Sequence, residues 1–256
     1  MTPIIDVCNI RKSFGGLTVI DDCSVRIAEG SITGMIGPNG AGKSTLFNII
    51  AGSLAPDSGE VLLDGEPITS LPAHLRFHKG LLRTFQIAHE FSHLTALENL
   101  MMVPPAQEGE RLFSNWLRPG RVRREEAEVR RRAQEVLDFI GLTRVRNEPA
   151  GNLSGGQKKL LELGRTMMTE ARVVLLDEIA AGVNRTLLGD LIGNIERLNR
   201  EMGYTFLVIE HDMDMIARLC DPVIVLAEGR VMLEGPIEEV QSHPEVIEAY
   251  FGAQSA

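Results

Sequence analysis

Short apolar runs recur along the chain and predict buried strands. Residues 32–36, 173–176, 206–209 and 223–227 carry no charged side chain and are each four or five residues long. Runs of this length, bounded by turn residues, are typical of strands that are covered on both faces. Strand-forming sequence is also frequent over residues 4–36. The pattern therefore predicts a fold built around sheets.

A helical pattern occupies the middle of the chain. Its clearest part is residues 125–140, an expected amphipathic helix whose apolar positions are Val129, Ala133, Val136, Leu137 and Ile140. Strands and helices alternate again from residue 171 onward. We therefore predict one domain over residues 1–256, with an α/β core and β subdomain in residues 1–71 and 170–256 and a helical subdomain in residues 72–169.

Composition narrows the class of protein. A chain of 256 residues with 44% hydrophobic side chains can bury one good core. No apolar run approaches the roughly 20 residues that cross a bilayer, and the first ten residues lack a basic cluster typical of a secretory signal. The net charge of −9 disfavours nucleic-acid binding, and the three cysteines read as small buried hydrophobes in a reducing compartment. We expect any membrane association to come through protein partners.

A glycine-rich segment follows the predicted strand at residues 32–36 and fits the phosphate-loop pattern G-x-x-x-x-G-K-[ST]. Its members are Gly37, Pro38, Asn39, Gly40, Ala41, Gly42, Lys43 and Ser44, and Thr45 completes the predicted nucleotide-binding set. Backbone N–H groups of such a loop point at phosphate oxygens, and the helix that follows adds its positive end. We expect Lys43 to reach the β- and γ-phosphates and Ser44 to ligate Mg²⁺. A chance glycine-rich turn is the alternative, but it leaves the flanking strand and helix unexplained.

Two carboxylates end the apolar run at residues 173–176. They are Asp177 and Glu178, at the carboxyl edge of a predicted parallel strand, where open α/β sheets bind ligands. Asp177 is placed to hold Mg²⁺, directly or through water, and Glu178 to act as general base on the attacking water. Taken alone, the pair is better interpreted as a solvated strand end. The phosphate loop is what favours the catalytic interpretation.

A further Ser-Gly segment begins a predicted helix between these two elements. It consists of Leu153, Ser154, Gly155, Gly156 and Gln157. A Ser-Gly helix cap accounts for the residue types but not for the spacing to Asp177. With residues 158–163 after it, the segment resembles the signature loop and helix of ATP-binding cassette (ABC) ATPases, which close over the ATP of a partner subunit. The resemblance implies a P-loop NTPase fold of the α/β class, with a RecA-like core, an N-terminal antiparallel β subdomain and an inserted α-helical subdomain.

Other family markers match in order along the chain. Phe14 takes the place of the aromatic residue that stacks on adenine, where the family more often has Tyr. Gln86 matches the glutamine that contacts Mg²⁺ and the lytic water, and His211 the switch histidine that contacts the γ-phosphate. The cofactors implied are ATP and Mg²⁺. By this resemblance, the catalytic residues are Glu178, His211, Gln86 and Lys43, and the Mg²⁺ ligands are Ser44, Gln86 and Asp177.

The sequences of several segments are similar to those of ATPase subunits of branched-chain amino-acid uptake systems. They are residues 14–17, 83–86, 180–184, 209–213 and 244–252. This resemblance implies a second ABC ATPase subunit (the same or a homologous chain), two transmembrane permease subunits and an extracytoplasmic solute-binding protein. It places the chain at the cytoplasmic face of the inner membrane, held there through the permeases. The ATPase subunits of importers of urea, short amides and aromatic acids share many of the same sequence motifs.

Two positions depart from the family pattern: Phe14 stands in place of Tyr, and Ile179 in place of Pro. Ile179 restores a backbone N–H and frees φ at a position where the family usually has Pro, which predicts altered turnover.

A lipid- or lipopolysaccharide-exporting ABC ATPase and a soluble ABC clamp ATPase are the rival functions. Arginines concentrated over residues 111–132 fit either a solvated face paired with glutamates or a partner or lipid contact. Residues 89–93 spell H-E-x-x-H, a zinc-protease pattern, but no third ligand motif supports a metal there.

Overall fold

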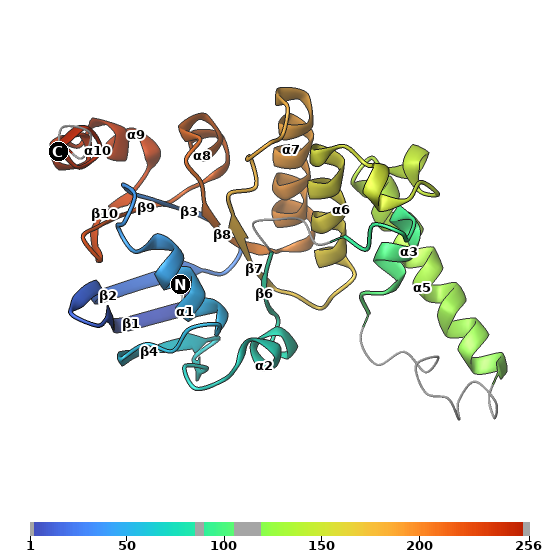
Figure 1. The fold of residues 1–256 in the computed structure, drawn as a ribbon, viewed down its shortest axis with the longest axis horizontal. Helices are drawn as coiled ribbons and strands as arrows, with labels where there is room; N and C mark the ends of the chain where they lie inside the picture. The colour runs from blue at the N-terminus through green and yellow to red at the C-terminus, as the bar shows by residue number, and fades with distance from the viewer. Residues whose placement is uncertain (1–2, 85–89, 105–118, 253–256) are drawn as a thin grey trace. The chain divides into compact units, whose positions relative to one another are not determined.

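The computed structural model describes residues 3–84, 90–104 and 119–252, and these form two compact units. The first unit comprises residues 1–83, 171–180 and 195–256, and the second comprises residues 84–170 and 181–194. The ribbon in Figure 1 carries the element labels used below. No helix in the described part of the chain combines the length and the apolar character needed to cross a membrane.

The first unit contains both sheets. Its strands are β1 (Pro3–Phe14), β2 (Leu17–Ala28), β3 (Ile32–Ile36), β4 (Ser58–Leu63), β5 (Glu66–Pro67), β6 (Leu81–Arg83), β7 (Val173–Asp177), β8 (Thr205–Ile209), β9 (Val223–Ala227) and β10 (Arg230–Gly235). Its helices are α1 (Lys43–Ala51), α2 (Ala73–His78), α8 (Met213–Leu219), α9 (Ile237–Ser242) and α10 (Pro244–Gly252). The second unit holds α3 (Ala96–Met101), α5 (Pro119–Phe139) and α6 (Gly155–Met167), and α7 (Arg185–Met202) continues from it into the first unit.

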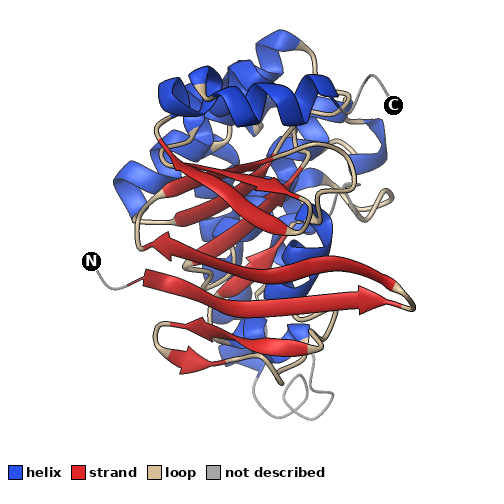
Figure 2. Cartoon of the chain, turned by 90° about the vertical axis from the view of Figure 1, so that its left-hand side faces the viewer, coloured by secondary structure: helices blue, strands red, loops and turns tan. Residues whose placement is uncertain are grey.

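The six-stranded sheet has the order β10-β9-β3-β8-β7-β6. Figure 2 shows the strands of the chain in red and the helices in blue. All neighbours pair in parallel except β10, which runs antiparallel to β9 at one edge. Every residue of β3, β7, β8 and β9 is buried, as expected for strands that are covered on both faces. Because parallel strands end at the same edge, the segments after β3, β7 and β8 meet there. The four predicted core strands are thereby confirmed, two of them one residue longer than the apolar run.

One strand of this sheet was not expected from the pattern. β6 lies within the segment predicted to be helical, and its three residues pair in parallel with the start of β7. Three residues are too few to show an alternating pattern. The helix-forming sequence on either side of β6 therefore leads to a helical prediction for the whole segment.

The antiparallel sheet has the order β2-β1-β4-β5. One continuous apolar core joins this sheet, α1 and the six-stranded sheet. Helix α1 buries Leu46, Phe47, Ile49 and Ile50 in that core. This packing fixes the helix that follows the phosphate loop, since its apolar face contacts both sheets.

A buried arginine completes the end of α1. Arg76 is 1% exposed, and its guanidinium donates to the carbonyl oxygens of Ile49 and Ile50, each at 2.7 Å. It also donates to the carbonyl oxygens of Leu71 and Thr69, each at 2.8 Å. Burial lowers the pKa of Arg76 to about 10. The last carbonyls of a helix lack partners within the helix, and a cation is favoured there, so Arg76 adds donors for Ile49 and Ile50 to those of the C-cap residue Gly52.

The second unit is helical. Helices α3, α5 and α6 pack together, and Ala133, Val136 and Leu137 of α5 are buried as the helical spacing predicts. The helix starts earlier than the predicted residue 125 and ends at Phe139. Arg131 pairs with Glu128 and Glu135 on the exposed face, which is the charge pairing expected of a solvated helix surface.

Candidate nucleotide-binding site

The loop between β3 and α1 has a backbone that only glycine accommodates at two positions. Gly37 has φ +152°, and a Cβ there would lie 2.0 Å from the carbonyl oxygen of Leu226. Gly42 has φ +99°, and its Cβ would lie 2.5 Å from Cδ1 of Ile20. Both positions combine an unfavourable φ with a close contact, so side chains are excluded. The predicted phosphate loop therefore has the curled conformation that its chemistry requires.

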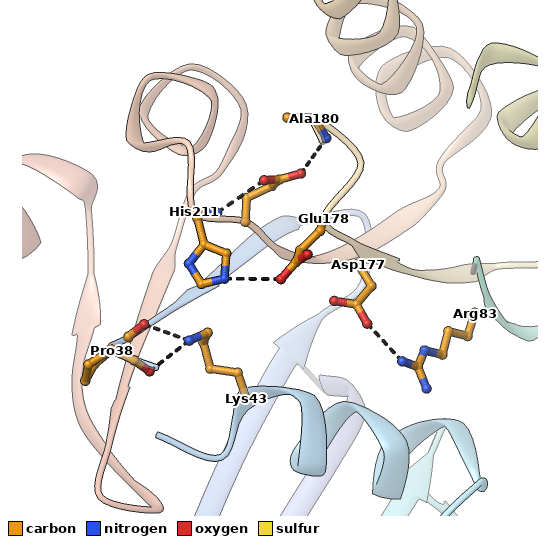
Figure 3. A network of polar contacts seen from close by, with 9 residues as sticks. Pro38, Lys43, Arg83, Asp177, Glu178, Ala180 and His211 are labelled. Carbon is orange, nitrogen blue, oxygen red and sulfur yellow. Dashed lines mark hydrogen bonds and ion pairs between the residues drawn. The ribbon is translucent and has the colours of Figure 1, made fainter. Parts of the chain in front are cut away.

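Lys43 lies buried against this loop. Its Nζ donates to the carbonyl oxygens of Gly37 at 2.7 Å and of Pro38 at 3.0 Å (Figure 3). Burial lowers the pKa of Lys43, and the negative charge of Glu178 acts in the opposite direction. An ammonium group has three donors, so two loop carbonyls leave one for a phosphate oxygen.

Glu178 and His211 are brought together at the carboxyl edge of the sheet. Nε2 of His211 lies 3.2 Å from Oε1 of Glu178, although the two residues follow different strands (Figure 3). Glu178 also has φ +48°, which is unusual for a residue with a side chain. Strained backbone of this kind is concentrated at functional sites, because the surroundings must hold it in place.

Glu210 holds this strained turn, although sequence reasoning did not assign it to the site. Glu210 is 4% exposed; its Oε1 accepts the Ala180 N–H at 2.7 Å and its Oε2 accepts the His211 N–H at 3.2 Å. The N–H of Glu178 itself donates to the carbonyl oxygen of Ile209 at 2.9 Å. Burial raises the pKa of Glu210, and the two backbone N–H groups oppose that rise. A carboxylate directly after a buried strand, beside the expected switch histidine, was the available signal.

Oxygen donors suitable for Mg²⁺ are present at the same edge. Ser44 is exposed in the first turn of α1, and Asp177 is a buried carboxylate at the end of β7. Mg²⁺ prefers oxygen ligands and usually retains several waters, so a hydroxyl and one carboxylate fit it. Asp177 also forms an ion pair with Arg83 of β6, a residue that sequence reasoning did not assign to the site. The third predicted ligand, Gln86, lies outside the described residues.

Phe14 ends β1 and is 50% exposed. The ammonium of Lys12 lies 5.6 Å from the centre of that ring. An exposed ring face is what adenine stacking needs, and the assignment stays a prediction.

The signature segment lies in the second unit and begins α6. Oγ of Ser154 accepts the Gln157 N–H at 3.3 Å, and Oε1 of Gln157 accepts the Ser154 N–H at 2.9 Å. This reciprocal pair is a capping box, so the helix-cap interpretation of Ser154 is correct. Gly156 is also needed for packing, because a Cβ there would lie 2.5 Å from Cδ1 of Leu187 in α7. The expected contact with a partner's ATP stays a prediction.

The H-E-x-x-H pattern has a structural explanation for its glutamate. Glu90 forms an ion pair with Lys158 of α6 at 2.7 Å. His89 lies outside the described residues. Within the part of the chain that the structure describes, no group of three histidine, cysteine or acidic residues could hold a metal ion.

Comparisons with known proteins agree with this site. A family model described as "ABC transporter" matches residues 20–181, and one described as "Branched-chain amino acid ATP-binding cassette transporter" matches residues 230–256. The chain is 39% identical over 253 residues to the probable branched-chain amino acid transport ATP-binding protein LivG of Archaeoglobus fulgidus, which covers 99% of this chain and 97% of that protein.

Solved structures are similar over nearly the whole chain. The ADP conformation of MJ1267, an ATP-binding cassette of an ABC transporter, is 35% identical with a TM-score of 0.83, covering 98% of this chain and 100% of the other. The dimeric post-hydrolysis state of the ATP-binding cassette MJ0796, bound to ADP and Pi, is 26% identical with a TM-score of 0.73, covering 91% of this chain and 98% of the other.

Proposed function

Because the chain belongs to the ATP-binding subunits of ABC transporters of the branched-chain amino-acid type, we propose specific roles for its residues and a specific transport task. The chain is an ABC ATPase with the cassette fold, a mixed α/β structure with an N-terminal antiparallel sheet and a parallel core. The observation that carries the proposal is the joining of the phosphate loop, Asp177 and the Glu178–His211 pair at one sheet edge.

In the proposed reaction the phosphate loop binds the nucleotide and Lys43 neutralises its β- and γ-phosphates. Glu178 takes the proton of the water that attacks the γ-phosphate, and His211 contacts that phosphate. The 3.2 Å contact between the two supports this division of roles, because it fixes the orientation of the Glu178 carboxylate. Ser44, Asp177 and Gln86 are the proposed Mg²⁺ ligands. When bound, the metal would neutralise the negative charge that develops during phosphoryl transfer.

We further propose that each ATP is shared between two cassettes. The first turn of α6 supplies backbone N–H groups and the positive end of a helix, which favour a phosphate. The relative MJ0796 is dimeric in its ADP- and Pi-bound state. In the proposed head-to-tail dimer, the segment at residues 153–157 closes over the partner's ATP. ATP then stabilises the closed dimer, and hydrolysis removes the phosphate that joins the halves.

The proposed transport task is uptake of branched-chain amino acids or a related small solute. The proposed partners are two permeases, a solute-binding protein and a second ATPase, with this chain at the cytoplasmic membrane face. The match of residues 230–256 to the branched-chain amino acid cassette model supports import over lipid or lipopolysaccharide export and over a soluble clamp.

Co-purification from native membranes tests the transport task. A tagged Glu178→Gln variant, which we expect to keep ATP binding, to slow hydrolysis and so to hold the closed dimer, is the bait of choice. We expect two permeases, a second ATPase and an amino-acid-binding protein, and uptake of labelled leucine by the reconstituted complex. Recovery of soluble partners alone would overturn the transport task and leave the ATPase assignment intact.

A further inference from the structure

Asp177, the proposed Mg²⁺ ligand, already has a positively charged partner. Nη2 of Arg83 lies 2.9 Å from Oδ2 of Asp177, and the two side chains are 24% and 6% exposed (Figure 3). A buried carboxylate requires a compensating charge, because transfer from water disfavours an isolated ion. Arg83 therefore supplies to Asp177 the positive charge that a metal ion would otherwise provide.

Other contacts fix the guanidinium at this place. Nη1 of Arg83 donates to Oδ1 of Asn48, and the guanidinium lies 6.0 Å from the centre of the Phe47 ring. Both partners belong to α1. Asn48 follows Ser44 by four residues, so the two side chains share one face of that helix. The guanidinium thus sits about one helical turn beyond the hydroxyl proposed to ligate Mg²⁺.

The Arg83 side chain is also incompletely satisfied. Its Nε is buried and has no hydrogen-bond partner in the described part of the chain. Among the described residues, the guanidinium is therefore held through its Nη atoms, by Asp177 and Asn48, and not through Nε.

We propose that Arg83 is a positioning residue that holds Asp177 before the metal arrives and is displaced from it by Mg²⁺. The inference rests on the proposed metal site at Ser44 and Asp177. A guanidinium and a divalent cation compete for the same carboxylate oxygen, so Arg83 sets how much Mg²⁺ the site requires.

The test is a Mg²⁺ titration of nucleotide binding with the full chain. The probe is a fluorescent non-hydrolysable ATP analogue at fixed concentration, and the readout is the Mg²⁺ concentration at half-maximal binding. Arg83→Gln removes the competing charge and should lower that midpoint roughly three- to tenfold, the range expected for a partly buried ion pair. Arg83→Lys keeps a charge and should stay closer to the wild-type midpoint.

The matched control is Arg172→Gln. Arg172 stands just before β7, at the end opposite Asp177, and pairs with Glu29 and Asp64. The Arg172→Gln substitution removes one positive charge from the same unit and should leave the Mg²⁺ midpoint of nucleotide binding unchanged. Circular dichroism checks folding, and Arg83→Met, which keeps an unbranched stem, replaces Arg83→Gln if that variant does not fold.

The outcomes separate the inference from the function on which it rests. A midpoint that is unchanged or raised in Arg83→Gln overturns the competition between Arg83 and Mg²⁺. An equal fall in Arg83→Lys overturns it as well, because charge would then not be the cause. If wild-type binding shows no dependence on Mg²⁺, the proposed metal site itself fails.

Discussion

Replacing Arg76 with methionine tests how the helix that follows the phosphate loop is held. The substitution keeps an unbranched apolar stem and removes the guanidinium that donates to four backbone carbonyls. Two of those carbonyls, at Ile49 and Ile50, belong to the last turn of α1. We expect Arg76→Met to destabilise the fold strongly although Arg76 contacts no predicted nucleotide-binding residue through these bonds.

The magnitude follows from the acceptors. A buried carbonyl that loses its donor costs about 1–3 kcal/mol. The Ile49 carbonyl keeps the Gly52 N–H as a donor at 3.2 Å, so three carbonyls carry most of the cost. The variant also avoids burying a charge, which offsets part of that cost. The expected net loss is about 3 kcal/mol, at the lower end of the values found when one partner of a buried charged interaction is removed.

Thermal unfolding followed by circular dichroism, without nucleotide, measures the effect. For a chain of this size, about 3 kcal/mol lowers the Tm by roughly 6–12 °C. Arg26→Met is the matched control, because Arg26 is largely exposed and pairs only at 3.4 Å with Asp6 among the ion pairs described. That variant should stay within about 1 kcal/mol of the wild type. Arg76→Lys, with three donors in place of five, should fall between the two.

The reasoning fails if Arg76→Met unfolds at the temperature of Arg26→Met. In that case the four short bonds would contribute no more than an exposed ion pair, and α1 would be held by its apolar face alone.

Three further predictions concern the catalytic edge. Glu178→Gln should keep ATP binding and lower the hydrolysis rate by about 10²–10⁴, measured by phosphate release, and near-normal turnover would remove Glu178 from its role as base. Glu210 has a pKa raised on folding above its ordinary 4.5, so its contribution to stability is present below that value and is lost as pH rises through the raised pKa. Urea unfolding from about pH 4 to 7 should therefore show wild-type stability falling relative to Glu210→Gln, and a relative rise would contradict the argument. Ile179→Pro should change turnover while Ile179→Val, which keeps the N–H, should not; equal ATPase rates and transport coupling in both would refute the role of that N–H.

The core of the fold and most of the site could be predicted because their signals are local. Each core strand is a single apolar run, and the phosphate loop, Asp177 and Glu178 directly follow such runs. The sheet-edge rule then brings the loop ends together without any knowledge of side-chain positions.

The residues whose roles could not be predicted from the sequence depend on contacts between distant segments. Arg83 reaches Asp177, 94 positions away, only because the short strand β6 pairs with β7. Glu210 reaches the Ala180 N–H across 30 positions, through the pairing of β7 with β8. Arg76 binds carbonyl oxygens, which carry no side-chain pattern that a sequence could reveal. In each case the register between elements, and not the residue type, determines the partner.

The close fit of Gly156 against Leu187 changes how substitutions in the signature segment should be understood. A side chain at position 156 would affect two properties at once: the spacing between α6 and α7, and the proposed approach of a partner's phosphate. A defect in Gly156→Ala therefore identifies neither cause by itself. Combining it with Leu187→Gly, which removes all three Leu187 atoms that crowd the added methyl group, separates them: restored hydrolysis assigns the defect to helix spacing, and persistent loss assigns it to the nucleotide.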